Sequence, residues 1–234
     1  FDMNMPKEVN RIITDGLSDF LFTAGAMANR NLDQSGREND NVFYVGNILI
    51  DSIRRNRKRL IKPTWLSSMA IEDGQYILLT INRRKLLNQT DVIKQLLTVL
   101  CEKAAATPII APVHEYVSDT VNKLDIKLKN LHLLPVQPYL TFGYLMNHAK
   151  AIVTDSGNVS EEATFFGIPC ITLNNYAEHP ETWKIGTNEL VGEDPEKLTK
   201  VMDKLNNKQW KKGSIPERWD GHTAERIVQI LLNE

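Results

Sequence analysis

The turn at Asp155–Gly157 combines residue types that could bind a phosphate group. It follows an apolar stretch and opens a helical pattern, and the free N–H groups and dipole of a helix start favour an anion. Its glycine lets the backbone approach a ligand closely. Glu162 lies on the same helix face as Asn158, four residues earlier, where its carboxylate could accept bonds from ribose hydroxyls. An ordinary capped turn, with Ser156 or Asp155 as the cap, is the alternative.

A second turn, at Gln137–Phe142, offers groups suited to a nucleobase. The amide of Gln137 could pair with the edge of a base, and Tyr139 or Phe142 could stack on its ring. The alternative is ordinary loop chemistry together with a phenylalanine that packs in the core.

Polar residues also follow three other apolar stretches. Arg83 and Arg84 could meet a phosphate or remain solvated. His114 stands alone, and a lone histidine is more often structural than functional. Glu178 and His179 lie at the start of a predicted helix, where capping is as good an explanation as binding. The sequence has no metal-ligand spacing, P-loop or nucleophile elbow, so we expect no metal and no cofactor.

The elements that must position these residues alternate regularly from residue 76 onward. Short apolar stretches predict strands at Tyr76–Ile81, Ile109–Val113, Leu131–Leu134, Ala151–Thr154, Cys170–Leu173 and Glu189–Val191. Helical patterns follow them at Thr90–Ala105, Val117–Lys127, Leu140–His148, Val159–Phe166, His179–Ile185 and Pro195–Leu205. This alternation predicts an α/β fold with a doubly wound parallel sheet, in which ligands bind beyond the carboxyl ends of the strands.

The spacing of apolar residues also predicts helices and strands in the remaining segments. We expect helices at Pro6–Leu17, Ala24–Gln34, Ile48–Leu60 and Thr223–Leu232, and strands at Phe20–Thr23 and Val42–Val45. The chain starts at Phe1 and enters a helix almost at once, which is typical of a chain that begins within a domain.

Composition narrows the classes of partner. The net charge is −1, so no overall field favours nucleic acid or an anionic membrane. The basic run Arg54–Arg59 is interpreted as a solvated helix end, with a polyanion or partner site as the alternative. No apolar run approaches the roughly 18 residues of a membrane span. Cys101 and Cys170 lie in apolar stretches and predict buried free thiols and a cytoplasmic protein.

Taken together, the motifs of this chain resemble those of the non-hydrolysing UDP-N-acetylglucosamine 2-epimerases. The family's Thr-Asp-Ser-Gly-Gly-x-x-Glu-Glu-Ala turn matches Thr154–Ala163. Further matches, in the same order along the chain as in the family, are Met5–Arg11, Val45–Asn47, Pro112–His114, Pro135–Met146, Gly167–Pro169, Ala177–Glu181 and Gly186–Gly192. The collinear set covers essentially the whole chain and is far more specific than any single motif.

The resemblance implies a glycosyltransferase-B-type fold of two Rossmann-like lobes. Residues 1–40 would then be a remnant of the N-terminal lobe, residues 41–212 the C-terminal UDP-binding lobe, and residues 213–234 a helix that returns toward the N-terminal lobe. It also implies an isomerase that interconverts UDP-GlcNAc and UDP-ManNAc, by eliminating and re-adding UDP, for polysaccharide biosynthesis. We expect a homodimer of the full-length protein.

Site roles follow from the same resemblance. The residues that would contact uracil and ribose are Gln137, Phe142 and Glu162. The residues that would hold the diphosphate are Ser156, Gly157 and Asn158.

Several positions depart from the family pattern. Lys7 replaces the family's first acid after Met-Pro, so that only Glu8 remains there, and Asn82 replaces a histidine. His179 replaces an arginine, and Asn158 replaces the second glycine of the phosphate turn. The candidate catalytic residues are therefore Glu8, Asn82 and His179, although asparagine cannot act as a general base. The alternative is a catalytically inactive UDP-sugar-binding or regulatory homologue, and a UDP-sugar glycosyltransferase is a weaker third hypothesis.

Overall fold

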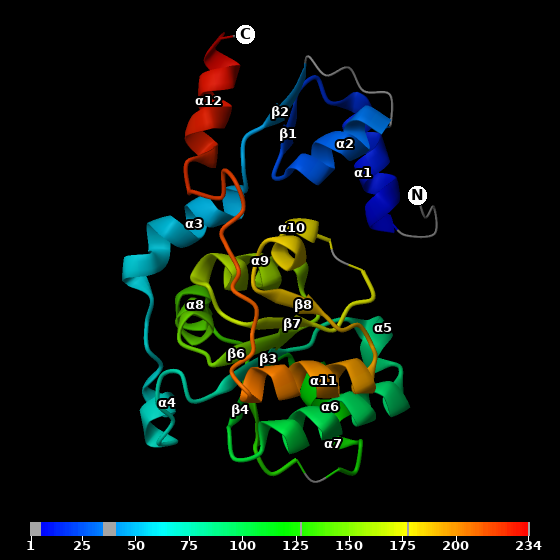
Figure 1. The fold of residues 1–234 in the computed structure, drawn as a ribbon, viewed down its shortest axis with the longest axis vertical. Coiled ribbons are helices and arrows are strands. Elements are labelled where there is room, and N and C mark those ends of the chain that lie inside the picture. The colour runs from blue at the N-terminus through cyan, green and yellow to red at the C-terminus, as the bar shows by residue number, and fades with distance from the viewer. Residues whose placement is uncertain (1–5, 35–40, 127, 177, 234) are drawn as a thin grey trace. The chain divides into compact units, whose positions relative to one another are not determined.

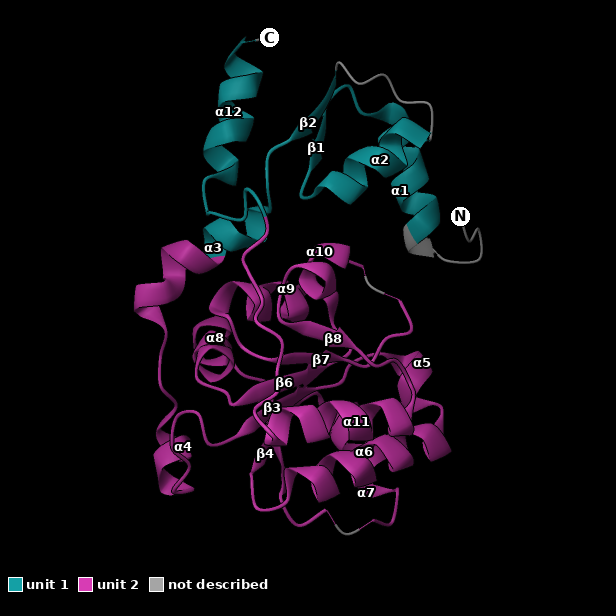
Figure 2. Ribbon diagram, viewed as in Figure 1, with its two compact units in different colours: residues 1–52, 217–234 teal, residues 53–216 magenta. Residues whose placement is uncertain are grey.

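The computed structural model describes residues 6–34, 41–126, 128–176 and 178–233, with no account of the side chains of residues 6 and 7. The chain divides into two compact units (Figure 2). Unit 1 comprises residues 1–52 and 217–234, and unit 2 comprises residues 53–216.

Unit 2 is built on a six-stranded parallel sheet (Figure 1). Its strands are β3 (Ile77–Thr80), β4 (Ile109–Val113), β5 (Leu131–Pro135), β6 (Ala151–Thr154), β7 (Cys170–Thr172) and β8 (Asn188–Leu190). Their order is β5-β4-β3-β6-β7-β8, so the chain returns to the middle of the sheet after β5. The strand order therefore reverses between β3 and β6, where a doubly wound sheet opens a crevice for ligands. The predicted fold class is confirmed.

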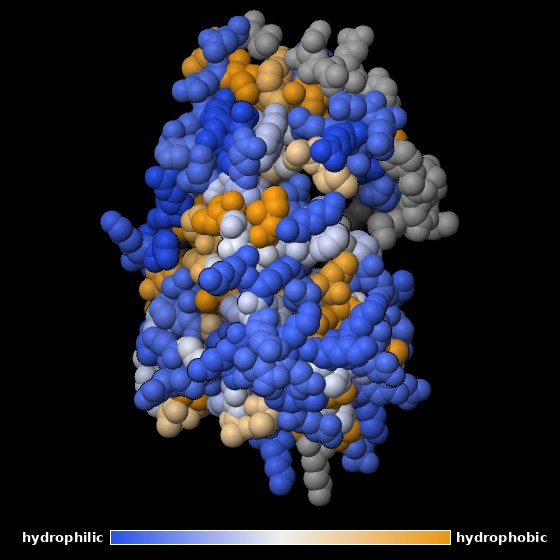
Figure 3. All heavy atoms as spheres, in the orientation of Figure 1, coloured by the Kyte–Doolittle hydropathy of each residue, from blue (hydrophilic) through white to orange (hydrophobic). Residues whose placement is uncertain are grey.

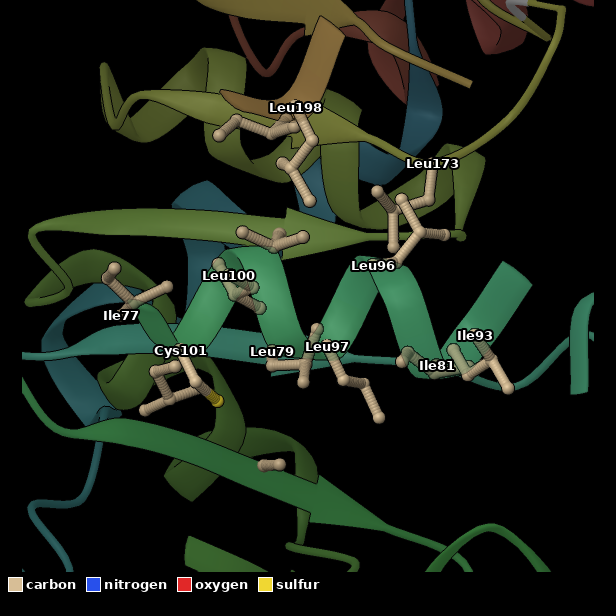
Figure 4. Close-up of a cluster of buried hydrophobic side chains, with 14 of the residues drawn as sticks. Ile77, Leu79, Ile81, Ile93, Leu96, Leu97, Leu100, Cys101, Leu173 and Leu198 are labelled. Carbon is tan, nitrogen blue, oxygen red and sulfur yellow. The ribbon is translucent and has the colours of Figure 1, made fainter. Parts of the chain in front are cut away.

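Helices cover both faces of this sheet because alternate strand residues point to opposite faces. Ile77, Leu79 and Ile81 belong to a buried cluster that packs beneath α6, α7 and α11 (Figure 4). Tyr76 and Leu78 belong to a second cluster, beneath α4, α8 and α9. The bounds of these helices are α4 (Thr64–Ser68), α6 (Thr90–Ala104), α7 (Glu115–Asn122), α8 (Tyr139–Asn147), α9 (Gly157–Phe166) and α11 (Pro195–Asn206).

Four helices, α3, α4, α5 and α10, differ from the sequence expectations in the following ways. The short helices α4 and α5 (Arg84–Leu87) were not predicted, since four or five residues are too few to show a helical period. The helix predicted at Ile48–Leu60 is α3 (Ile48–Asn56), followed by a 3₁₀ turn at Arg57–Arg59. A third short helix, α10 (Pro180–Lys184), begins one residue later than predicted. The basic run thus lies at a helix end, as expected.

Unit 1 has two short parallel strands, in which Leu21 pairs with Val42. Its elements are α1 (Pro6–Leu17), β1 (Leu21–Thr23), α2 (Ala26–Gln34), β2 (Val42–Tyr44), the start of α3 and α12 (Thr223–Asn233). Asp51 accepts hydrogen bonds from the first two backbone N–H groups of α12, at 3.1 and 2.7 Å. Side-chain bonding within unit 1 therefore links segments from opposite ends of the chain.

Hydrophilic residues predominate over unit 2 on the face drawn in Figure 3, with smaller apolar patches between them. Within the described ranges, no helix combines the length and apolar character needed to span a bilayer. Cys101 and Cys170 are buried free thiols, as predicted, and burial raises the pKa of Cys101 to about 11.

Candidate nucleotide site

The site lies at the carboxyl ends of β3 and β6, where the strand order reverses. A pocket of about 200 Å³ opens there between the turns that follow β3, β4, β5 and β6. Its lining includes four predicted site residues, together with His114 and Asp155. The four are Asn82, Gln137, Phe142 and Ser156. A hollow of about 660 Å³ lies at the opposite edge of the sheet, near Ala105 and Pro108, and contains none of the predicted residues.

Asp155 joins the turns after β3 and β6. It is 1% exposed, and its Oδ2 accepts hydrogen bonds from the backbone N–H groups of Asn82, at 2.8 Å, and Arg83, at 2.7 Å. Burial raises the pKa of Asp155, whereas these backbone bonds oppose that rise. The strands below are linked as well, since the hydroxyls of Thr80 and Thr154 are 2.6 Å apart. The inner end of the pocket is therefore held by bonds between neighbouring strands.

The start of α9 presents backbone N–H groups beside this pocket. Ser156 is the residue before the first helical turn, and its side chain makes no capping bond. The carboxylate of Asp155 is engaged with the β3 turn instead. The alternative of an ordinary capped turn is thus wrong for both side chains. Gly157 is buried and Asn158 is exposed, so these two predicted diphosphate residues differ in their access to solvent.

Glu162 lies one turn further along α9 and is buried, with 5% of its surface exposed. The Tyr139 hydroxyl, at the start of α8, donates to its Oε1 at 3.4 Å. Burial raises the pKa of Glu162 to about 7, and the tyrosine hydrogen bond opposes this only partly. A carboxylate with so little hydrogen bonding for its burial retains the capacity to accept bonds from a ligand.

The outer end of the pocket consists of side chains from the turn after β5. The side-chain nitrogen of Gln137 donates to the Pro135 carbonyl at 2.8 Å. The side-chain oxygen of Gln137 takes no part in that bond. Phe142 is half-buried and packs against the second cluster while it lines the pocket. The ring of His114 stacks on Tyr116, with centroids 5.7 Å apart. His114 therefore has a packing role, and it also lines the pocket.

Arg83 crosses from the turn after β3 to the loop before α10. Its Nε donates to the Asp155 carbonyl at 2.8 Å, and its guanidinium bonds the Tyr176 hydroxyl at 2.6 Å and Glu178 Oε1 at 2.7 Å. The sequence offered no signal for this bridge, because its partners lie more than 70 residues away. Arg84 lies over the ring of Tyr116 instead.

The three candidate catalytic residues are in different settings. Asn82 lines the pocket, and its side-chain oxygen accepts a bond from the Tyr116 hydroxyl at 3.0 Å. His179 lies outside the pocket lining, and its Nδ1 is 3.2 Å from the buried carboxylate of Glu161. Glu8 belongs to unit 1 and pairs with Arg11 at 2.9 Å.

The pocket offers hydrogen-bond acceptors and backbone donors, and the guanidinium of Arg83 lies beside it on Asp155. The side chain of Lys7 lies outside the described residues. Across those residues, no group of three or more histidine, cysteine or acidic side chains could hold a metal ion. The acceptors suit the hydroxyl groups of a ligand, and the backbone donors and the guanidinium suit an anionic group.

Comparisons with known proteins point to one family. The sequence model for UDP-N-acetylglucosamine 2-epimerase matches residues 1–232. The UDP-N-acetylglucosamine 2-epimerase of Methanocaldococcus jannaschii is 36% identical over 244 residues, which cover 99% of this chain and 65% of the relative. This chain therefore spans slightly less than two thirds of the length of that relative.

Solved structures agree with this relationship. The crystal structure of the M. jannaschii UDP-GlcNAc 2-epimerase, in complex with UDP-GlcNAc and UDP, matches with a TM-score of 0.82 and 33% identity. The match covers 100% of this chain and 66% of that one. The Neisseria meningitidis UDP-GlcNAc 2-epimerase, bound to UDP-GlcNAc, matches with a TM-score of 0.85 and 29% identity, over 98% of this chain and 65% of that one.

Proposed function

The chain belongs to the UDP-N-acetylglucosamine 2-epimerase family, and on that premise we propose that it supplies the UDP-binding lobe of a UDP-sugar 2-epimerase. The expected reaction interconverts UDP-GlcNAc and UDP-ManNAc. The single observation that carries the proposal is the pocket at the β3–β6 switch point, which brings Gln137, Phe142 and Ser156 together. Gln137 and Phe142 follow β5 and Ser156 follows β6, and all three match motifs that this chain shares with the family.

Each part of UDP has groups of suitable chemistry at this site. Uracil would lie at the outer end, where Phe142 offers a ring face and Gln137 an amide. The ribose hydroxyls would donate to Glu162, whose buried carboxylate accepts a long hydrogen bond of 3.4 Å from the Tyr139 hydroxyl. The diphosphate would accept from the N–H groups of Gly157 and Asn158 at the start of α9 and from the Ser156 hydroxyl, which makes no capping bond.

The chemical step would be an elimination followed by a re-addition. A base removes the C2 proton of the sugar while the bond from C1 to the UDP oxygen breaks, which leaves a glycal and free UDP. UDP then returns to C1 and a proton is delivered to the other face of C2. The N–H groups of α9 would stabilise the departing diphosphate. Glu8 and His179 are the candidate acid–base groups, and Asn82 could only hydrogen bond to the sugar.

Isothermal titration of the chain with UDP tests the binding site. We expect heat of binding in the wild-type chain and its loss in Ser156→Ala and Glu162→Ala. The matched controls are Ser68→Ala and Glu102→Ala, which alter exposed helix positions away from the pocket. A wild-type chain that does not bind UDP, or binding that survives both site substitutions, would contradict the proposal.

A second candidate function is a UDP-sugar-binding or regulatory homologue without epimerase activity. The observation that favours it is Asn82, which lines the pocket and cannot remove a proton. Incubating the full-length gene product with UDP-GlcNAc in heavy water distinguishes the two. An epimerase exchanges the C2 proton for deuterium, whereas a binding protein leaves that proton in place although UDP binds.

A further inference from the structure

The carboxylate of Glu178 lies against the first residue of α9. A Cβ built on Gly157 would be 3.2 Å from the Glu178 Cδ and closer still to its Oε2. The glycine at this position therefore leaves room for an acidic side chain that comes from the loop before α10. This carboxylate is at the same helix start that the proposed function assigns to the diphosphate.

Arg83 holds this carboxylate in place. Its guanidinium is 2.7 Å from Glu178 Oε1, and both side chains are largely shielded, with 28% and 23% of their surfaces exposed. The arginine is itself anchored, because its Nε and its backbone N–H both bond to Asp155. The ring of Tyr176 lies 5.3 Å from the guanidinium. The guanidinium of Arg83 is thus fixed beside α9, and its terminal nitrogen pairs with the carboxylate of Glu178.

We propose that Glu178 is a specificity-determining residue of the nucleotide site, which competes with the diphosphate for Arg83 and for the start of α9. The inference rests on the proposed function. A carboxylate and a phosphate present the same acceptor geometry to a guanidinium, so one can take the place of the other. Two anions cannot share one helix start without repulsion. When a diphosphate binds, Glu178 moves away and Arg83 bonds to the phosphate oxygens.

This exchange discriminates between ligands by their phosphate groups. A diphosphate restores the charged bonds that Arg83 loses with Glu178, whereas uridine has no anion with which to displace the carboxylate. The base and ribose contacts are at other residues, so uridine binding is independent of Glu178. Removing the charge of Glu178 should therefore strengthen UDP binding and leave uridine binding unchanged.

The test is isothermal titration of the full chain with UDP and with uridine, using wild type, Glu178→Gln and the control Glu181→Gln on α10. We expect Glu178→Gln to bind UDP about tenfold more tightly, with uridine affinity unchanged and the control like wild type. Unchanged or weaker UDP binding in Glu178→Gln would overturn the proposal, because Glu178 would then be neutral or would support the site.

Arg83→Ala supplies an independent measurement. Loss of the guanidinium should weaken UDP binding about tenfold or more without affecting uridine. Equal UDP affinity in wild type and Arg83→Ala would also overturn the exchange. A wild-type chain that binds neither UDP nor uridine would refute the proposed function itself. A wild type that binds both, with an unaltered Glu178→Gln, would refute this inference alone.

Discussion

The turn after β6 and the second turn of α9 each bury a carboxylate, but the protein treats the two groups differently. Asp155, which is 1% exposed, accepts two backbone hydrogen bonds at 2.7 and 2.8 Å. Glu162, which is 5% exposed, accepts one side-chain bond within the described part of the chain, from Tyr139 at 3.4 Å. Burial raises the pKa of both groups, and for Glu162 it raises the pKa to about 7.

The difference shows that burial alone does not define the role of an acid. The bonds of Asp155 are directed at the backbone of the β3 turn, so its carboxylate contributes to the architecture of the pocket. Glu162 receives too few donors to offset its loss of hydration, which is a cost in stability for the protein alone. A ligand that brings hydroxyl donors can remove that cost, so Glu162 is suited to binding.

The largest expected effect is the loss of stability in Asp155→Ala. Two backbone N–H groups lose a charged acceptor, and we expect the free energy of unfolding to fall by about 3 kcal/mol. Urea unfolding measures this change. Asp155→Asn keeps an acceptor oxygen and should retain most of the stability. The exposed control Asp119→Ala should change it by less than about 0.5 kcal/mol. If Asp155→Ala behaved like this control, the architectural role of Asp155 would be disproved.

The next effect is a pH dependence of stability from Glu162. Its folded pKa of about 7 is above the ordinary value of 4.5, so its contribution is fully present below pH 4.5 and is lost as the pH rises through 7. Wild type should therefore lose about 2–3 kcal/mol relative to Glu162→Gln between pH 5 and pH 8. Urea unfolding of both chains across this range gives the difference. Parallel curves would show that Glu162 is already well solvated or well bonded.

A smaller effect concerns ligand binding. Ribose hydroxyls donate to the ionised carboxylate, so UDP binding should favour the charged form of Glu162. We expect UDP affinity to rise about tenfold from pH 6 to pH 8 in the wild type, as Glu162 ionises. Titrations with Glu162→Gln should show little of this rise. The same slope in both chains would assign the pH dependence to another group, such as the phosphate of UDP.

The sequence was sufficient to predict the edge of the sheet at which these acids lie. Short apolar stretches such as Ile109–Val113 and Ala151–Thr154 appear in the structure with the predicted bounds, because strands buried on both faces need continuous apolar side chains. Parallel strands place their carboxyl ends on one edge, so Gln137 and Ser156 were expected near each other. The structure brings both into one pocket.

The partners of the acids were not predictable in the same way. Asp155 was interpreted as a possible helix cap because capping is local, whereas its observed partners are 72 and 73 residues away. The carboxylate of Glu161 is 3.2 Å from the candidate catalytic residue His179, which lies 18 residues away in the sequence. Such pairs depend on strand order, and a periodic pattern within each segment carries no information about that order.

The smallest expected effect is that of Tyr139→Phe, which removes the hydroxyl that donates to Glu162. Because this bond lowers the pKa of Glu162, its loss should move the midpoint of the pH-dependent stability change to higher pH. At pH 8 the free energy of unfolding should fall by about 0.5–1 kcal/mol, the usual worth of one hydrogen bond. Tyr116→Phe is the matched control, since its hydroxyl bonds to Asn82 and should leave the midpoint in place. A midpoint that moved to lower pH, or did not move, would mean that the tyrosine does not stabilise the charged carboxylate. Glu162 would then depend on the ligand alone for its hydrogen-bond donors.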